Sequence, residues 1–205
     1  VIFDKNVIEF VTVAAEFCAF LERAESMKRS TFVDTTLKIL PLLYLKASML
    51  PKCEMIGDES PETYVTEEIY EVLRINLASI LAEKDDYLEV FLPDMAYSDE
   101  PIKKNISEDL ADIYQDIKDF IFVFQLGLNE TMNDSLAICQ ENFGLLWGQK
   151  LVNTMRALHD VKYSPKARGE DEEEEEYEPE NNEDCHCEDD DCHCHDHGCH
   201  CHDDE

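Results

Sequence analysis

The sequence predicts an all-α fold, a bundle of five or six helices followed by an acidic tail rich in cysteine and histidine. Apolar residues recur at three- and four-residue intervals in successive segments up to residue 159, which is the spacing of one helix face. The alternation of apolar and polar residues that is typical of strands is absent, and the connecting segments are short. We therefore expect a helical domain over 1–165, a linker over 166–184 and the tail over 185–205.

Two amphipathic helices are expected first, over 6–25 and 32–50. In each of them the apolar residues form one stripe, and in the first the glutamates lie away from it. Ser30 and Thr31 can cap the second helix, because their hydroxyl groups accept hydrogen bonds from free backbone N–H groups. Pro41 should kink or restart that helix, because proline has no N–H to donate and crowds the preceding turn.

The middle of the domain is predicted to alternate loops and helical segments. Residues 51–64 hold two prolines and a glycine, which favours a loop. Thr66 should cap a helix that ends near residue 83, with two glutamates in the first turn, where the helix dipole favours acids. A short amphipathic segment over 87–92 is then followed by a second loop over 93–105.

Two longer helices close the domain, over 107–126 and 131–159. Gly127 is placed to stop the first of them, because glycine accepts the left-handed backbone conformation that ends many helices. Gly144 and Gly148 lie four residues apart in the second helix. A glycine inside a helix costs about 1 kcal/mol relative to alanine, so we expect this pair to let another helix approach closely.

Acidic residues repeat along the helix over 107–126, on the side opposite its apolar stripe. They are Glu108, Asp112, Asp116 and Asp119. We interpret this row as a solvated helix face. A di-iron carboxylate bundle, which is the other interpretation, would need Glu-x-x-His pairs on facing helices, and residues 1–165 contain none.

The net charge is strongly negative and unevenly distributed. Residues 169–205 carry nineteen acids and no Lys or Arg, a net charge of −19, whereas residues 1–168 carry a net charge of −12. Such a surface repels phosphate, so neither nucleic acid nor an anionic membrane is an expected partner. No apolar run is long enough to span a bilayer, and Asp4, Glu9 and Glu16 interrupt the N-terminal segment, which argues against a secretory signal. We therefore expect a cytoplasmic protein with reduced cysteines.

Three segments of the domain resemble a family of uncharacterised bacterial proteins that is known only as a domain of unknown function. They are YLEVFLPD (87–94), ISEDLADIYQDIKDF (106–120) and NFGLLWGQKLVNTMRALH (142–159). The resemblance covers most of the domain and none of the Cys/His tail. It implies a helical fold and a bacterial source, and it carries no activity or catalytic residues.

The domain lacks the familiar catalytic motifs GxGxxG, GK[ST], GxSxG and HExxH. Cys18 and Cys139 lie on apolar stripes and are expected to be core residues, whereas Cys53 lies in a loop. A nucleophilic cysteine needs a neighbouring base, and His159 is the only histidine before the tail. A catalytic Cys–His pair is therefore not favoured.

The strongest catalytic candidate in the domain is acidic. Residues 67–71 match EExxE and residues 83–86 match ExxD, an order that resembles the Mg²⁺-binding motif of all-α nucleotide pyrophosphohydrolases. That resemblance implies carboxylates on two helices that hold magnesium against substrate phosphates. Here only eleven residues separate the two halves, so both could lie on one helix, and a solvated first turn is the simpler interpretation.

The tail consists of three heptads, CHCEDDD, CHCHDHG and CHCHDDE, each opened by a Cys-His-Cys unit. The heptads lack an apolar seam, so their period does not indicate a coiled coil. Thiolate and imidazole are the usual protein ligands of zinc and related transition metals. The candidate metal ligands are Cys185, His186, Cys187, Cys192, His193, Cys194, His195, His197, Cys199, His200, Cys201 and His202. At four ligands per ion, they would hold about three zinc-like ions.

Transition-metal binding by the tail is therefore the leading hypothesis, with Zn, Ni, Co or Cu as the candidate ion. The acidic linker before it should be extended and disordered, which would hold the tail away from the domain. Two other functions remain open: a protein-interaction or scaffold domain with an incidental tail, and the Mg-dependent hydrolase. Enzymatic activity is not favoured, because the tail supplies the only concrete chemistry.

Overall fold

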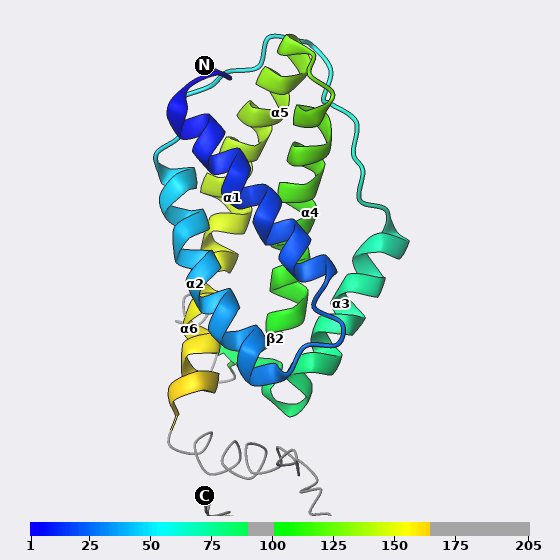
Figure 1. Ribbon diagram of the computed structural model, residues 1–205, viewed down its shortest axis with the longest axis vertical. Coiled ribbons are helices and arrows are strands. Elements are labelled where there is room, and N and C mark those ends of the chain that lie inside the picture. Colours follow the sequence, from blue (N-terminus) through cyan, green and yellow to red (C-terminus); the bar gives the residue numbers. More distant parts are fainter. Residues whose placement is uncertain (90–100, 165–205) are drawn as a thin grey trace, which may run out of the picture.

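The computed structural model describes residues 1–89 and 101–164, and these ranges are mostly helical (Figure 1). Within them lie six α-helices, a π-helical turn and one small hairpin, which confirms the predicted all-α class. In Figure 1, α1 crosses the front of the bundle obliquely, and α3 stands at one side, packed mainly along α4. The predicted linker and Cys/His tail lie outside the described residues.

The first two helices, α1 (Lys5–Glu22) and α2 (Arg29–Ser48), pack against each other with their apolar sides inward. The side chain of Asp4 caps α1 by accepting a hydrogen bond of 2.8 Å from the N–H of Asn6. This bond satisfies one of the N–H groups that the first turn of a helix leaves free.

The structure differs from two expectations for α2. The helix begins at Arg29, so Ser30 and Thr31 lie inside it and do not cap it. It also continues through Pro41, so the helix does not restart there, which was one of the two outcomes expected of this proline. Pro41 lies on the exposed side of α2, where water can bond the carbonyl group that the missing N–H leaves free, and α2 packs on both α1 and α6.

The connection from α2 to α3 (Glu67–Leu81) has no helix or strand, which confirms the predicted loop over 51–64. It follows an extended course past α5 and α4, seen as the cyan trace in Figure 1. The Thr66 hydroxyl then caps α3, as expected, by accepting a hydrogen bond of 3.3 Å from the N–H of Ile69.

A two-stranded antiparallel hairpin, β1 (Asp86–Glu89) with β2 (Ile102–Asn105), joins α3 to α4. The prediction that strands are absent was therefore wrong here, as was the predicted loop at residues 102–105. A 3₁₀ turn over Ala82–Lys84, with Ala82 at φ 48°, reverses the chain before β1. Four residues per strand are too few for a period of two to be recognised in the sequence.

The central helix is α4 (Ile106–Gln125), since α1, α3, α5 and α6 all pack against it. Eleven of its twenty residues are buried. The Asp85 carboxylate holds its start, because it accepts hydrogen bonds of 2.7 Å from both the N–H and the hydroxyl of Ser107. Gly127, at φ 75°, follows its end, which confirms the predicted stop.

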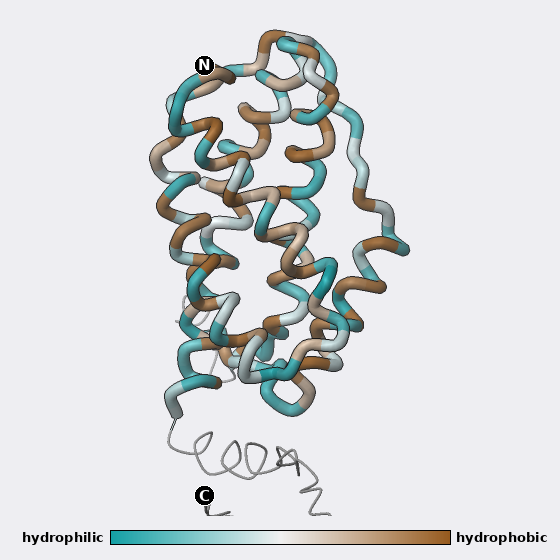
Figure 2. Tube along the Cα trace, viewed as in Figure 1, coloured by the Kyte–Doolittle hydropathy of each residue, from teal (hydrophilic) through white to brown (hydrophobic). Residues whose placement is uncertain are grey.

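Hydrophobic residues recur along every helix of the bundle (Figure 2), and aromatic rings fill the centre of the core. The ring of Phe10 on α1 lies 5.5 Å from that of Phe120 on α4 and 6.5 Å from that of Trp147. Trp147 is fully buried, and its indole N–H donates a 3.1 Å hydrogen bond to the carbonyl oxygen of Cys139. The indole therefore packs without leaving an unsatisfied polar group.

The long final helix of the prediction is three consecutive helical segments. They are α5 (Asn129–Asn142), the π-helical turn Phe143–Trp147, and α6 (Gly148–Tyr163). The N–H of Gly148 donates to the carbonyl oxygen of Phe143, five residues earlier, which is the hydrogen bond that defines a π-helix.

Neither glycine of this region admits a neighbouring helix, so that prediction was wrong. A Cβ atom at Gly144 would meet nothing within 4 Å. A Cβ atom at Gly148 would lie 2.3 Å from the carbonyl oxygen of Phe143 and 2.9 Å from its ring. The π-helical turn itself therefore requires glycine at position 148.

Substitution of the two glycines should have opposite effects on stability. We expect Gly148→Ala to lower the free energy of unfolding by about 1–3 kcal/mol, because the new methyl group collides with backbone. Gly144→Ala should be neutral or raise it by up to about 1 kcal/mol, because alanine favours the helix and finds open space. Urea unfolding followed by circular dichroism measures both, and equal effects would contradict the role assigned to the π-helical turn.

Candidate functional site

The polar side of α4 carries a row of aspartates that bind other elements of the fold. The predicted solvated face was wrong for Asp112, Asp116 and Asp119, which are all part-buried, whereas Glu108 is exposed. Asp109, one residue off the predicted row, is buried. Helical spacing brings these carboxylates into a line that faces the α2–α3 connection, α3, the hairpin, α5 and α6.

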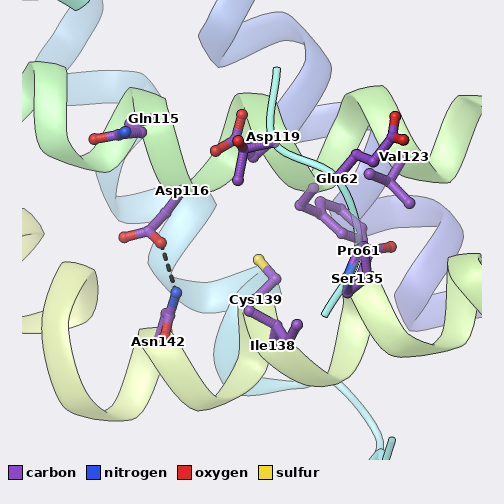
Figure 3. Close-up of a pocket in the computed structure, with 12 residues that line it drawn as sticks. Pro61, Glu62, Gln115, Asp116, Asp119, Val123, Ser135, Ile138, Cys139 and Asn142 are labelled. Carbon is purple, nitrogen blue, oxygen red and sulfur yellow. Dashed lines mark hydrogen bonds between the residues drawn. The ribbon is translucent and has the colours of Figure 1, made fainter. Parts of the chain in front are cut away.

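At one end of this row, Asp119 holds the α2–α3 connection against the bundle. Its Oδ1 atom accepts hydrogen bonds of 2.7 Å from the N–H groups of both Tyr64 and Val65. The neighbouring Asp116 accepts a 2.7 Å hydrogen bond from the side chain of Asn142, which reaches across from α5 (Figure 3).

A pocket of about 210 Å³ lies between α4, α5 and the α2–α3 connection. Asp116, Asp119 and Asn142 supply polar groups to its wall, and Phe120, Val123 and Ile138 are among its apolar lining residues (Figure 3). The Cys139 thiol also borders it.

Burial raises the pKa of the two aspartates of the pocket, Asp116 and Asp119, above the usual value for aspartate. For Asp116 the raising effect of burial outweighs the hydrogen bond from Asn142, and the nearby Asp119 and Asp112 raise the pKa further. For Asp119 burial outweighs the two backbone hydrogen bonds. Burial also raises the thiol pKa of Cys139 well above its usual value, so this thiol is not a ready nucleophile.

Toward the other end of the row, Asp112 forms an ion pair with Lys150 of α6. It also accepts a 2.8 Å hydrogen bond from the hydroxyl of Tyr70 on α3. Burial is the largest single effect on the pKa of Lys150 and lowers it. The hydrogen bond to Asp112 and the nearby negative charges, led by that of Asp112, together outweigh burial and raise that pKa. Asp109 accepts a hydrogen bond from the hydroxyl of Tyr87 on β1.

This polar network continues into the hairpin. Asn153 of α6 donates a 3.2 Å hydrogen bond to Glu89 of β1, and Lys104 of β2 lies 3.9 Å from the same carboxylate. The network thus joins α3, α4, α6 and the hairpin. Sequence reasoning missed the residues that complete it, because partners such as Asp112 and Lys150 lie far apart in the chain and neither belongs to a motif.

The acidic motif of the predicted hydrolase is divided among unrelated contacts. Glu71 pairs with Arg74 on its own helix, and Glu83 pairs with Arg29. Asp86 pairs with Lys103 and accepts a 2.7 Å hydrogen bond from the side chain of Asn105. Among the described residues, no three His, Cys, Asp or Glu side chains are placed to hold one metal ion. The arrangement gives the hydrolase hypothesis no support.

The cysteines of the bundle occupy structural positions. Cys18 and Cys139 are buried, which confirms their interpretation as core residues, and burial raises the pKa of the Cys18 thiol. The Cys53 thiol lies 3.2 Å from the side-chain oxygen of Asn133. The His159 ring packs on Tyr163, with ring centres 4.6 Å apart. The structure thus brings neither buried thiol into a pair with the histidine.

The sequence-predicted metal ligands all lie outside the described residues. They are the twelve Cys and His residues from Cys185 to His202. Their assignment as ligands therefore stays a prediction from the sequence.

The described fold corresponds to one family over its whole length. The family model of a domain of unknown function, DUF5063, matches residues 1–164. The chain belongs to this family. The match confirms the resemblance drawn from residues 87–94, 106–120 and 142–159, and it ends before the Cys/His tail begins.

A solved structure is similar to this DUF5063 chain. It is the crystal structure of protein BF1032 from Bacteroides fragilis, with 93% sequence identity and a TM-score of 0.74. The match covers 82% of this chain and 98% of that chain. No curated protein matches this chain. Across the described helices, none combines the length and apolar character that crossing a membrane requires.

Two substitutions on α4 should change stability in opposite directions at pH 7. Asp116→Asn should raise the free energy of unfolding, because it removes a charge that burial disfavours while the amide oxygen can still accept from Asn142. Asp112→Asn should lower it by about 1–2 kcal/mol, because Lys150 loses its charged partner.

The pH dependence provides a stricter test of the Asp116 variant. The folded-state pKa of Asp116 is raised, so the wild-type protein loses stability as pH rises from the unfolded value, about 4, through the folded value. The advantage of Asp116→Asn should therefore shrink toward pH 4 and level off above the folded pKa. Urea unfolding between pH 4 and 8 measures it, and a variant that is less stable at pH 7 would refute this account.

Proposed function

We propose that this DUF5063 protein binds transition metal ions through its C-terminal tail, in storage, buffering or delivery of the metal. The observation that carries the proposal is the Cys-His-Cys unit that opens each of three consecutive heptads over 185–205. Both thiolate and imidazole bind Zn²⁺, Ni²⁺, Co²⁺ or copper, and the closely spaced ligands of one unit can reach the same ion.

The chemistry of the helical bundle supports a separation of roles between bundle and tail. Burial raises the thiol pKa of Cys18 and of Cys139, which disfavours the thiolate form that binds metal. The described residues also lack a three-ligand cluster. The proposal therefore assigns metal uptake to the tail, and it requires a reducing compartment, for which we expect the cytoplasm.

The charge of the tail affects both the capture and the retention of metal. Nineteen acids over 169–205 concentrate cations around the ligands and so favour rapid encounter. The same acids disfavour thiolates in the metal-free tail, and an incoming ion must displace their protons. Metal affinity should therefore fall steeply as pH decreases.

Native mass spectrometry of the reduced, full-length protein, titrated with Zn²⁺, Ni²⁺ and Cu⁺, tests the proposal. We expect discrete uptake that reaches about three zinc ions at four ligands each. A chain that ends at Gly169 should show no such steps. A full-length variant with serine at the six tail cysteines should lose most of the uptake, since the histidines and acids alone bind more weakly.

The serine variant distinguishes metal binding by the cysteines from general attraction of cations to the acidic tail, because it keeps all nineteen acids of residues 169–205. Equal metal uptake by the wild-type protein, the serine variant and the shortened chain would contradict the metal-binding proposal. Repeating the zinc titration at pH 6 should show weaker binding than at pH 7.5, as proton displacement requires.

A further inference from the structure

Helix α3 is the least buried long helix of the bundle and presents apolar side chains to solvent. Only Leu73, Leu77 and Leu81 of its fifteen residues are buried. Val72 and Ile75 keep 61% and 54% of their surface exposed. In Figure 1, α3 stands at the side of the bundle, where one of its flanks packs along α4.

A groove of about 390 Å³ runs between α3 and the C-terminal end of α1, and we name it the α3 groove. Ile69, Val72, Leu73 and Tyr114 supply its apolar lining. Two carboxylates, those of Glu22 and Glu68, also line it. The α3 groove therefore combines an apolar surface with negative charge.

Its two carboxylates differ in how they are held. Glu22 is fixed by Tyr114 and Lys118, which both bind its Oε1 atom, the tyrosine hydroxyl at 2.8 Å. Glu68 is exposed, and among the described residues no Lys or Arg forms an ion pair with it. An incoming cation at Glu68 would thus meet a carboxylate that has no competing positive partner there.

We infer that the α3 groove docks an amphipathic helix of a partner protein, whose apolar face is flanked by lysine or arginine. Helices that bind in grooves place apolar side chains at i, i+3, i+4 and i+7 into an apolar surface. A basic residue on the flank of such a helix would meet the exposed carboxylate of Glu68, and opposite charge steers the encounter.

The charge of the chain argues against the two other occupants of the α3 groove. A second copy would bring the same carboxylates and a net charge of −31 to a surface that is already negative. The chain's own residues 169–205 carry −19 and no Lys or Arg. Like charges that face each other at an interface disfavour both complexes, whereas a basic helix removes this repulsion.

A labelled synthetic peptide tests this inference on the full-length protein. The probe is a fluorescein-labelled helix of about 18 residues, or five turns, with leucine on one face and lysine on both flanks. A matched peptide carries glutamate in place of lysine. Fluorescence anisotropy at moderate salt should show binding of the lysine peptide and much weaker binding of the glutamate peptide.

Paired variants locate the binding surface. Val72 lines the α3 groove, and Ile75 is the exposed apolar residue three positions further along the same helix. Val72→Gln with Ile75→Gln should weaken binding of the lysine peptide about tenfold or more, because it removes one apolar anchor from the groove and a second apolar side chain from the exposed side of α3. The control is Leu42→Gln with Leu45→Gln on α2, where the two side chains are 43% and 51% exposed. It should change the affinity less than about twofold, since neither residue lines the α3 groove. The acidic tail is identical in both variants, so its attraction for lysine cancels in the comparison.

A charge reversal completes the test. Glu68→Lys should weaken the lysine peptide and strengthen the glutamate peptide, which a general loss of structure would not do. Equal loss of binding in the α2 and α3 variants, or equal binding of the two peptides, would overturn the inference. So would sedimentation velocity that shows a dimer abolished by Val72→Gln with Ile75→Gln, because a second copy would then occupy the groove.

Discussion

The structure depends on how the aspartates along α4 are satisfied in a chain that is short of positive charge. Residues 1–168 contain 29 acids and 17 basic residues, so most buried carboxylates must find neutral donors. Backbone N–H groups of the α2–α3 connection serve Asp119, an amide serves Asp116, and a tyrosine hydroxyl serves Asp109. Within the described ranges, Asp112 is the one aspartate of this row that forms an ion pair with a lysine of a facing helix. Each of these aspartates binds a different element. The polar side of α4 therefore holds the neighbouring elements in place by hydrogen bonds, while its apolar side packs in the core.

The backbone N–H groups of the α2–α3 connection are likewise bonded by polar side chains of neighbouring helices. It has no helix or strand, yet side chains of the helices bind its backbone at successive points. Gln140 accepts from the N–H of Cys53 at 3.0 Å, and Asp134 accepts from the N–H groups of Ile56 and Gly57. Asp119 binds it near its far end. Polar residues of α4 and α5 therefore substitute for the hydrogen bonds that regular structure would supply, and the connection is held in one course over the pocket.

Apolar periodicity predicted the helices well, because each one buries a single face against the core. It failed where the deciding contact lies elsewhere in the chain. The row that includes Asp112 and Asp116 is polar, which the sequence shows, but its neighbours Lys150 and Asn142 come from other helices. Gly148 is required by the π-helical turn and not by the close approach of another helix. Either requirement would place a glycine at this position, so the sequence alone cannot distinguish them. The candidate metal site is the opposite case, because its ligands over 185–205 are proposed from the sequence alone and lie outside the described residues. The DUF5063 match also ends before them, at residue 164. The function of the bundle and the function of the tail therefore have to be tested separately.

The buried indole at the π-helical turn has a practical consequence. Trp147 is the only tryptophan in the chain, and it is packed against Phe10 and Phe143 with its N–H bonded to the carbonyl of Cys139. Its intrinsic fluorescence is therefore a single-site optical probe of the junction between α5 and α6. Excitation of the indole reports the dry, apolar surroundings of the native junction, and a red shift in emission marks entry of water there. Because the tail contains no tryptophan, the same signal can follow the bundle while metals or peptides are added, without any label.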